Sequence, residues 1–304
     1  MKNHGKNRLP KIIAVVGPTA SGKSDLAVKI ARKYNGEIIS ADSRQVYRGL
    51  NIGTGKITKH EMLGVPHHLL DVADPKKRFT VADFKTLADK AIADISSRGK
   101  LPIICGGTGF YIDTVTSGSI LPDVQPNKAL RRKLGQKSAT ELFEILKKLD
   151  PKRAKNIDQN NSVRLIRAIE IAQALGAVPP LATDNENKYQ TLFIGIKIDK
   201  EKLKAKILKR LNSRLEQGMV DEAKKLHVSG LSWRRMHELG LEYRYLAQLL
   251  QGKISKSEFI EKLNTEIWHY ARRQIQWFKR NQKIHWFALT EKTKINAAIN
   301  QFVR

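Results

Sequence analysis

The chain has 304 residues, of which 56 are Lys or Arg and 29 are Asp or Glu, so its formal net charge is +27. Hydrophobic residues make up 41% of the sequence, which is enough for a packed core and argues against intrinsic disorder. No apolar run approaches the roughly 18 residues that a membrane-spanning helix needs, so we expect no membrane association. Cys105 is the only cysteine, which excludes an intramolecular disulfide and any multi-cysteine metal site. These features favour a protein of the reducing cytoplasm.

The basic residues are distributed along the whole chain and form no single basic tail. A field of positive charge that extends over a large face is typical of proteins that bind phosphate-rich nucleic acid, because each neutralised phosphate releases condensed counterions. A generally lysine-rich proteome is the alternative explanation. The charge therefore indicates a polyanionic partner and leaves its identity open.

The first third of the chain alternates apolar strands with amphipathic helices. Short apolar runs at 12–16, 37–40 and 101–105 have the length and composition of buried strands, and helical spacing of apolar residues marks 22–33 and 82–97 as helices. Strands that alternate with helices predict a parallel, doubly wound sheet. The expected fold class is therefore α/β.

After about residue 116 the alternation of strands and helices ends and the composition of the sequence changes. Residues 117–190 contain several prolines and two amphipathic segments, 139–149 and 162–175, which predict a small all-helical insertion. A strand at 191–198 then returns to the sheet. The remainder predicts helices followed by a closing strand, at 201–217, 220–227, 241–251, 256–279 and 285–287. We expect a core formed by 1–116 and 191–304, interrupted by the insertion 117–190.

A phosphate-binding loop follows the first predicted strand. The pattern G-x-x-x-x-G-K-[ST] is matched, between a strand and a helix, by Gly17, Pro18, Thr19, Ala20, Ser21, Gly22, Lys23 and Ser24. Glycines let such a loop turn tightly so that backbone N–H groups and the helix N-terminus converge on phosphate oxygens. Lys23 adds a positive charge, and the hydroxyl of Ser24 is a candidate ligand for Mg²⁺. The expected core is thus like that of the P-loop nucleoside triphosphate hydrolases.

The acidic residue that completes a typical nucleotide hydrolase is absent from the expected position. The strand ending at Cys105 continues into Gly106-Gly107-Thr108, and the clearest acid after a strand is Asp42. Loops at the carboxyl ends of parallel strands share one crevice, so Asp42, Thr108 and the phosphate loop should face one another. A carboxylate opposite a bound phosphate compound is a candidate general base, and its alternative is an acid that caps a turn.

Three further features have competing interpretations. The last long helix interleaves Arg272, Arg273 and Arg280 with aromatic residues, which fits a surface that binds RNA or an amphipathic helix packed on the core. The adjacent His67 and His68 should point in different directions, and we interpret them as structural or pocket-lining residues, not as a zinc site. Cys105, in a buried strand, is expected to be a small core residue.

Several ungapped motifs together resemble the tRNA dimethylallyltransferases, in their bacterial form. They are Gly17 to Ser24, Ser40-Ala41-Asp42-Ser43-Arg44-Gln45-Val46-Tyr47, Asn51-Ile52-Gly53-Thr54, His67-His68-Leu69-Leu70-Asp71, Gly106-Gly107-Thr108-Gly109-Phe110-Tyr111, Arg164-Leu165-Ile166-Arg167-Ala168 and Arg272-Arg273-Gln274-Ile275-Gln276-Trp277-Phe278. The resemblance covers essentially the whole chain in order, which is far more specific than the phosphate loop alone.

The resemblance implies an enzyme that transfers a dimethylallyl group from its diphosphate to N6 of adenosine 37 in tRNAs that read codons beginning with U. It implies that Asp42 is the general base, and that Thr19, Lys23, Arg210 and Ser24 with Mg²⁺ bind the diphosphate. Contacts to the tRNA anticodon stem-loop are implied for a larger set: Asp42, Ser43, Arg44, Gln45, Thr108, Arg131, Val163, Arg164, Leu165, Ile166, Arg167, His237, Gly240, Leu241, Glu242, Arg272, Arg273, Gln274 and Trp277. With so much surface committed to RNA, we expect a monomer.

The chain departs from the family pattern in three places. Gly240-Leu241 stands where the family commonly has Gly-Tyr, the stretch after Pro122 aligns with a shift of about two residues that makes Arg131 the tRNA-contacting arginine, and there is no C-terminal zinc-finger extension. Two alternatives remain at this point: an adenylate prenyltransferase that acts on free nucleotides, and a non-catalytic, nucleotide-dependent RNA-binding P-loop protein. A small-molecule kinase would leave the excess charge unexplained.

Overall fold

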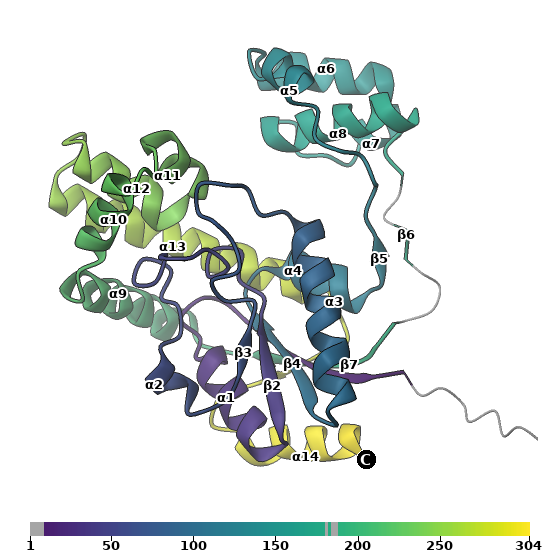
Figure 1. The fold of residues 1–304 in the computed structure, drawn as a ribbon, viewed down its shortest axis with the longest axis vertical. Helices are drawn as coiled ribbons and strands as arrows, with labels where there is room; N and C mark the ends of the chain where they lie inside the picture. The colour runs from purple at the N-terminus through teal and green to yellow at the C-terminus, as the bar shows by residue number, and fades with distance from the viewer. Residues whose placement is uncertain (1–8, 180–181, 184–187) are drawn as a thin grey trace, which may run out of the picture. The chain divides into compact units, whose positions relative to one another are not determined.

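The computed structural model describes residues 9–179, 182–183 and 188–304, and its larger sheet has six parallel strands (Figure 1). The strand order is β3-β2-β4-β1-β7-β8. The strands are β1 (Lys11–Val16), β2 (Gly36–Ser40), β3 (His67–His68), β4 (Leu101–Gly106), β7 (Gln190–Ile196) and β8 (Ile284–Phe287). The predicted α/β class with a parallel sheet is confirmed. The edge strand β3 was not predicted, because two residues are too few to show a strand pattern, and the ends of some other strands differ by one or two residues.

The strands read as continuous apolar runs because both faces of the sheet are covered. Ile12, Ala14 and Val16 of β1 face one hydrophobic cluster, which includes Phe84 and Ile92 of helix α3 (Val81–Ser97). The alternate residues of β1 face a second cluster, which includes α1 (Lys23–Lys33) and α14 (Lys292–Val303). Burial on both sides is what a doubly wound parallel sheet requires. Because β1, β2 and β4 run parallel, the loops that follow them lie at one edge of the sheet.

A helical layer packs beside the loops that follow β2. It comprises α9 (Lys200–Glu216), α10 (Met219–Val228), α11 (Trp233–Leu239), α12 (Leu241–Leu250) and α13 (Lys256–Lys279). Its core includes Ile207, Met236 and Phe259, and it also takes in Val46 and Leu50 from the long segment after β2. This packing holds a segment without regular structure against the helices and close to the carboxyl edge of the sheet.

Residues 119–186 form a second compact unit, whereas residues 1–118 and 187–304 form the first. The second unit contains α5 (Lys128–Leu134), α6 (Ala139–Leu149), α7 (Pro151–Ala154) and α8 (Ser162–Leu175) around a core of its own, which includes Leu142, Leu146 and Ile169. The prediction that this insertion is all-helical was wrong in one respect. β5 (Ser119–Ile120) and β6 (Ala182–Thr183) pair as a two-stranded antiparallel ladder, which is too short to leave an alternating pattern in the sequence.

The helices that the sequence did not predict are mostly short. They are α2 (Lys59–Met62), α4 (Gly109–Thr116), α5, α7, α11 and the longer terminal helix α14. A helix of one or two turns presents too few apolar positions for its period to be recognised, and its stability comes from capping and packing. Within the part of the chain that the structure describes, no helix is both long and apolar enough to cross a membrane.

Candidate functional site

A polar pocket opens at the carboxyl edge of the sheet, inside the first unit. Its walls come from the phosphate loop, the ends of β2 and β4, the segment after β2, and helices α9 and α13. It is lined by Thr19, Lys23, Ser24, Ala27, Ile38, Ser40, Asp42, Gln45, Thr54, Ile57, His67, Cys105, Gly106, Arg210, Tyr270 and Gln274. The structure thus brings the predicted phosphate loop, Asp42 and Arg210 into one cavity.

The phosphate loop has the backbone shape that its sequence predicts. Gly22, at the N-terminus of α1, has φ 91°, a left-handed conformation that glycine adopts without steric cost. Ala20 also lies in the left-handed region, with φ 60°, where a side chain is unfavourable. The Lys23 ammonium donates to the carbonyl of Pro18 at 3.1 Å, so it lies over the loop.

Two cations from distant parts of the chain meet in the pocket. Burial lowers the pKa of Lys23, the nearby Asp42 carboxylate partly offsets this, and the neighbouring Arg210 lowers it further. The Arg210 guanidinium donates to the carbonyl of Gly55 at 2.9 Å, and burial lowers the pKa of Arg210 to about 10. Arg210 therefore remains charged at neutral pH, and an anion in this pocket would relieve the repulsion between the two cations.

Ser24 and Cys105 both line the pocket and are in contact. The thiol of Cys105 is hydrogen-bonded to the hydroxyl of Ser24, and burial raises the pKa of Cys105 to about 11. A thiol that stays protonated is a poor nucleophile, so Cys105 serves as a small packing residue at this position. Cys105 lies near the end of β4, the strand after which a typical nucleotide hydrolase has its acidic residue.

Asp42 caps a turn and also lines the pocket. One oxygen, Oδ1, accepts from the backbone N–H groups of Arg44, at 2.8 Å, and Gln45, at 3.3 Å, so the carboxylate caps the turn that follows β2. The same side chain lines the pocket. A carboxylate whose orientation is fixed through one oxygen can present the other to a ligand, which suits a base that must face a particular nitrogen.

Thr108 links the loop after β4 to the loop after β2. Its Oγ1 accepts from the N–H of Ser43 at 3.0 Å, and its side chain is also hydrogen-bonded to Tyr270 on α13. Burial raises the pKa of Tyr270, so this phenol remains neutral. Tyr270 was not predicted as a pocket residue from the sequence. The available signal was its spacing of four residues from Gln274, which puts both on one face of a helix.

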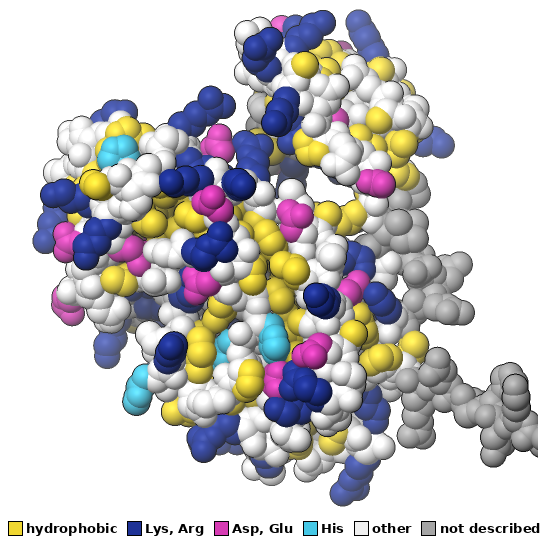
Figure 2. Space-filling view, viewed as in Figure 1, with side chains coloured by type: hydrophobic (Ala, Val, Ile, Leu, Met, Phe, Trp, Pro, Cys, Tyr) yellow, Lys and Arg dark blue, Asp and Glu magenta, His cyan; other side chains and the backbone are white. Residues whose placement is uncertain are grey.

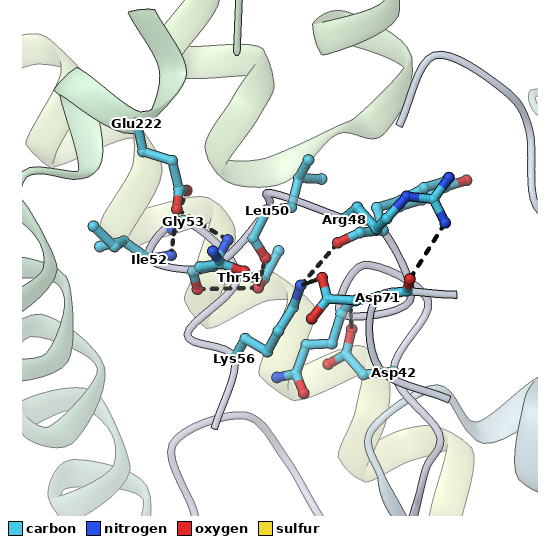
Figure 3. Close-up of polar contacts among 12 residues, drawn as sticks. Asp42, Arg48, Leu50, Ile52, Gly53, Thr54, Lys56, Asp71 and Glu222 are labelled. Carbon is cyan, nitrogen blue, oxygen red and sulfur yellow. Dashed lines mark hydrogen bonds and ion pairs between the residues drawn. The ribbon is translucent and has the colours of Figure 1, made fainter. Parts of the chain in front are cut away.

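The motif Asn51 to Thr54, to which the sequence analysis gave no role, is held in place beside the pocket (Figure 3). The carboxylate of Glu222 on α10 accepts from the N–H groups of Asn51 at 2.9 Å, Ile52 at 2.7 Å and Gly53 at 2.9 Å, and from the hydroxyl of Tyr243 at 2.7 Å. On the other side of this segment, the guanidinium of Arg214 donates to the carbonyl of Gly53 at 3.1 Å. These bonds position Gly55, the carbonyl partner of Arg210.

The other contacts of this segment fix it to its surroundings. The Thr54 hydroxyl, which belongs to the pocket lining, donates to the carbonyl of Leu50 at 2.7 Å. The Lys56 ammonium donates to the carbonyl of Tyr47 at 2.8 Å and forms an ion pair with Asp71 (Figure 3). The motif Asn51 to Thr54 thus supplies backbone groups that hold pocket residues in place.

The face of α13 toward the sheet differs from the prediction. Gln274 is only 5% exposed, and both ends of its amide are hydrogen-bonded within the protein, so the structure gives it no free surface for RNA. The indole N–H of Trp277 donates to Asp113 at 2.8 Å, and its ring is covered by the guanidinium of Arg280 at 4.0 Å. Arg272 and Arg273 are exposed, as expected. Gln274 and the Trp277 ring thus agree with the alternative of an amphipathic helix packed on the core, while Arg272 and Arg273 lie on its exposed side.

Residues predicted to contact tRNA in the second unit fall into three groups. Leu165 is fully buried in the core of that unit, which contradicts its predicted role at the surface. Arg131 and Arg167 both form ion pairs with the buried Glu170, at 2.6 and 2.5 Å, while Ile166 is partly buried against the core. Val163 is 75% exposed and Arg164 is also exposed.

The predicted contacts around α11 and α12 lie at a strained turn. Gly240 has φ 73° and Leu241 has φ 36°, both in the left-handed region. Glu242 is mostly buried and pairs with Arg214 at 3.1 Å, which links it to the clamped segment. His237 is partly exposed in the last turn of α11.

The paired histidines point in different directions, as predicted. His67 lines the pocket, and its Nδ1 lies 2.9 Å from the carbonyl of Val65. The Nε2 of His68 lies 2.8 Å from the carboxylate of Glu37, which also binds Arg98 and Lys100. Among the described residues there is no cluster of three or more His, Cys, Asp or Glu side chains that could hold a metal.

Lys and Arg side chains are spread over the visible surface of both units (Figure 2). They lie among acidic and apolar side chains. This agrees with the distribution of charge along the sequence and with a binding field that extends over a broad surface.

Comparison with known proteins supports one family throughout. A sequence model of the family described as IPP transferase matches residues 45–281. The chain is 44% identical, over 90% of its length and 88% of the relative, to tRNA dimethylallyltransferase 2 of Citrifermentans bemidjiense. It is 39% identical to the tRNA dimethylallyltransferase of Anoxybacillus flavithermus over 96% of this chain and 95% of that relative.

Solved structures agree with the sequence relatives. The full-length tRNA isopentenylpyrophosphate transferase of Bacillus halodurans superposes with a TM-score of 0.72 at 36% identity, covering 96% of this chain and 98% of that one. A eukaryotic dimethylallyltransferase acting on tRNA gives a TM-score of 0.80 at 27% identity, covering 96% of this chain and 77% of that one. Sequence, fold and pocket thus lead to the same conclusion, that this chain belongs to the IPP transferase family.

Proposed function

We propose that this protein is a tRNA dimethylallyltransferase, which transfers the dimethylallyl group of dimethylallyl diphosphate to N6 of adenosine 37 in tRNAs that read codons beginning with U. The observation that carries the proposal is a pocket in which the phosphate loop, the two partly buried cations Lys23 and Arg210, and Asp42 converge, in a chain that belongs to the IPP transferase family. Its relatives are named for this activity.

The diphosphate binds at the phosphate loop. Backbone N–H groups at the N-terminus of α1, the Lys23 ammonium and the Arg210 guanidinium face the space it would occupy. Negative charge grows on the diphosphate as its bond to the allylic carbon lengthens. Cations placed there beforehand stabilise this charge without having to reorganise, which is often the largest single contribution to catalysis.

Mg²⁺ is the metal that these donors suit. Mg²⁺ in phosphate sites takes one or two protein oxygens and completes its shell with phosphate oxygens and water, and the hydroxyl of Ser24 is the oxygen that the phosphate loop offers. When bound, the ion would neutralise part of the charge on the diphosphate. The absence of an acid after Cys105 accords with a diphosphate that departs intact, since no water has to be activated for attack on phosphorus.

Asp42 accepts the proton that the reaction releases. The bond between the allylic carbon and the diphosphate oxygen breaks, a bond from N6 to that carbon forms, and the diphosphate leaves with the bonding electrons. The exocyclic nitrogen then loses one proton to the Asp42 carboxylate, whose orientation the N–H groups of Arg44 and Gln45 fix. Because an adenine amine is a weak nucleophile, a base positioned to take this proton assists formation of the new bond.

The acceptor base must leave the stack of the anticodon loop to reach the pocket. Exposed cations such as Arg164, Arg272 and Arg273 are available to hold the phosphate backbone of the anticodon stem-loop while the base enters. We include in the proposal that the enzyme acts as a monomer.

The test is a transfer assay with purified protein, dimethylallyl diphosphate and Mg²⁺. Unmodified tRNA, its anticodon stem-loop and AMP are compared as acceptors by mass spectrometry of the nucleosides, and ATP is added as a competitor. We expect prenylation of both RNAs at adenosine 37 and none of AMP. Prenylation of AMP alone would make the protein an adenylate prenyltransferase. Tight binding of ATP with no transfer would make it a nucleotide-dependent RNA-binding protein.

A further inference from the structure

One side chain of α13 joins the phosphate loop after β1 to the loop after β4, and residues of both loops line the pocket. The Oε1 of Gln274 accepts from the N–H of Thr19 in the phosphate loop at 2.7 Å, and its Nε2 donates to the carbonyl of Gly107, after β4, at 2.9 Å. The residue is 5% exposed. Loss of this amide would leave the buried carbonyl of Gly107 and the partly buried N–H of Thr19 without their partners, and an unpaired buried polar group costs more than an exposed one.

The sequence around both contacts is adapted to this bridge. A Cβ atom added at Gly107 would collide with the amide of Gln274, and one added at Gly109 would collide with the indole ring of Trp277. The glycines after β4 therefore leave the space into which two residues of α13, one turn apart, are inserted. This accounts for two sequence motifs, 106–111 and 272–278, as two halves of one contact.

The phosphate loop needs such support because it contains a strained residue. Ala20 adopts φ 60°, in the left-handed region that costs an L-residue roughly 1–2 kcal/mol. Strained conformations persist only where surrounding contacts enforce them. The bond from Gln274 fixes the peptide that precedes Thr19, next to Ala20, whereas the turn's own hydrogen bond from Ser21 to Pro18 is long, at 3.3 Å.

We propose that Gln274 is a positioning residue for diphosphate binding, and not a contact to the acceptor RNA. It holds Thr19 and the strained turn in the shape that receives phosphate. It also keeps this turn at a fixed separation from the loop that carries Thr108, which in turn holds Ser43 beside Asp42. The inference rests on the proposed function only in taking the ligand of the phosphate loop to be a diphosphate.

The test compares Gln274→Met with Gln276→Met, which makes the same change two positions along the helix at an exposed side chain. Calorimetry with inorganic pyrophosphate and Mg²⁺ measures the diphosphate site, filter binding measures affinity for unmodified tRNA, and hydrogen exchange of the unliganded protein measures protection of the Thr19 amide. Gln274→Met should weaken pyrophosphate binding roughly tenfold, about 1.4 kcal/mol, and speed exchange at Thr19 about tenfold or more. Affinity for tRNA should stay within about twofold of wild type, and Gln276→Met should match wild type in pyrophosphate affinity and Thr19 exchange.

Wild-type pyrophosphate affinity and Thr19 protection in Gln274→Met, together with weakened tRNA binding, would overturn the inference. If Gln274→Met does not fold, Gln274→Asn replaces it, because the shorter amide keeps its polarity but cannot reach both loops. The results expected for Gln274→Asn, and those that would overturn the inference, are the ones given for Gln274→Met. Failure of the proposed function looks different. Wild-type protein that binds pyrophosphate but prenylates no RNA would refute the function and leave the comparison of these variants valid.

Discussion

The clamp that Glu222 places on residues 51–53 can be tested by replacing one oxygen atom. In Glu222→Gln the side chain keeps its size, but one of its two acceptor oxygens becomes an NH₂ donor. In the wild-type protein each oxygen of the carboxylate accepts two hydrogen bonds. Oε2 accepts from the N–H groups of Asn51 and Ile52, and Oε1 accepts from the N–H of Gly53 and the hydroxyl of Tyr243. The Tyr243 hydroxyl can reverse its role and accept from the new NH₂ group, whereas a backbone N–H cannot.

The structure sets the size of the effect. The most favourable placement of the new amide leaves the N–H of Gly53, a buried residue, without an acceptor and converts the remaining bonds from charge-assisted to neutral ones. Hydrogen bonds to a charged group contribute about 1.5–3 kcal/mol and neutral ones about 0.5–1.5 kcal/mol, and a stranded donor costs about 1–3 kcal/mol. The combined loss of local stability should be about 3 kcal/mol.

Hydrogen exchange is the appropriate assay, because a chain with two compact units need not unfold in one step. A local loss of about 3 kcal/mol corresponds to amide exchange roughly 100-fold faster at residues 51–53. Glu216→Gln, at an exposed glutamate of α9, is the matched control and should exchange like wild type. Equal exchange rates at 51–53 in wild type and Glu222→Gln would refute the clamp.

Three further predictions concern the sheet, the interlocked glycines and the surface charge. Glu37 is 2% exposed and is bound by Arg98, Lys100 and His68. The hydrogen bond from Arg98 above all holds the pKa of Glu37 well below the usual value. Glu37→Gln should therefore lower the free energy of unfolding by about 3 kcal/mol at pH 7. Because the folded pKa is depressed, this difference should shrink as pH falls below about 4.3, and a difference that grows toward acid pH in denaturant titrations would contradict the assignment. Gly109→Ala should lower stability by about 1–3 kcal/mol in thermal melts, since the added methyl group must displace the Trp277 ring from its hydrogen bond to Asp113; an unchanged melting temperature would show that the ring yields freely. Affinity for tRNA should fall steeply between about 50 and 200 mM salt while that for dimethylallyl diphosphate falls much less, and parallel salt slopes for the two ligands would argue against separate roles for surface and pocket cations.

Much of the fold could be predicted from sequence because its signals are local. The central strands are continuous apolar runs, and α1, α3 and α13 show a clear helical period, so their predicted ends lie within a residue or two of the observed ones. The phosphate loop was predictable because its glycine, lysine and serine serve one ligand through backbone geometry. The short helices and the β5–β6 ladder were not, because capping and tertiary contacts stabilise them more than any periodic pattern does.

The site was harder to predict, because one residue type can serve two purposes. A glutamine in a basic helix fits RNA binding as well as it fits the bridge that Gln274 forms, and only the positions of Thr19 and Gly107 distinguish the two. Leu165 lies between two arginines in sequence, yet the helix turns it into the core. Glu222 lies about 170 residues from the segment it clamps, and no local pattern reports a contact at that separation.

The most direct test of the central claim is single-turnover transfer by Asp42→Ala, measured with labelled dimethylallyl diphosphate, Mg²⁺ and an anticodon stem-loop, alongside the affinity of the variant for both substrates. If Asp42 is the base in a pocket that the phosphate loop and Arg210 complete, the variant should bind pyrophosphate and RNA within a few-fold of wild type and transfer the prenyl group at least about 100-fold more slowly. Transfer at the wild-type rate, with both substrates bound, would contradict the account.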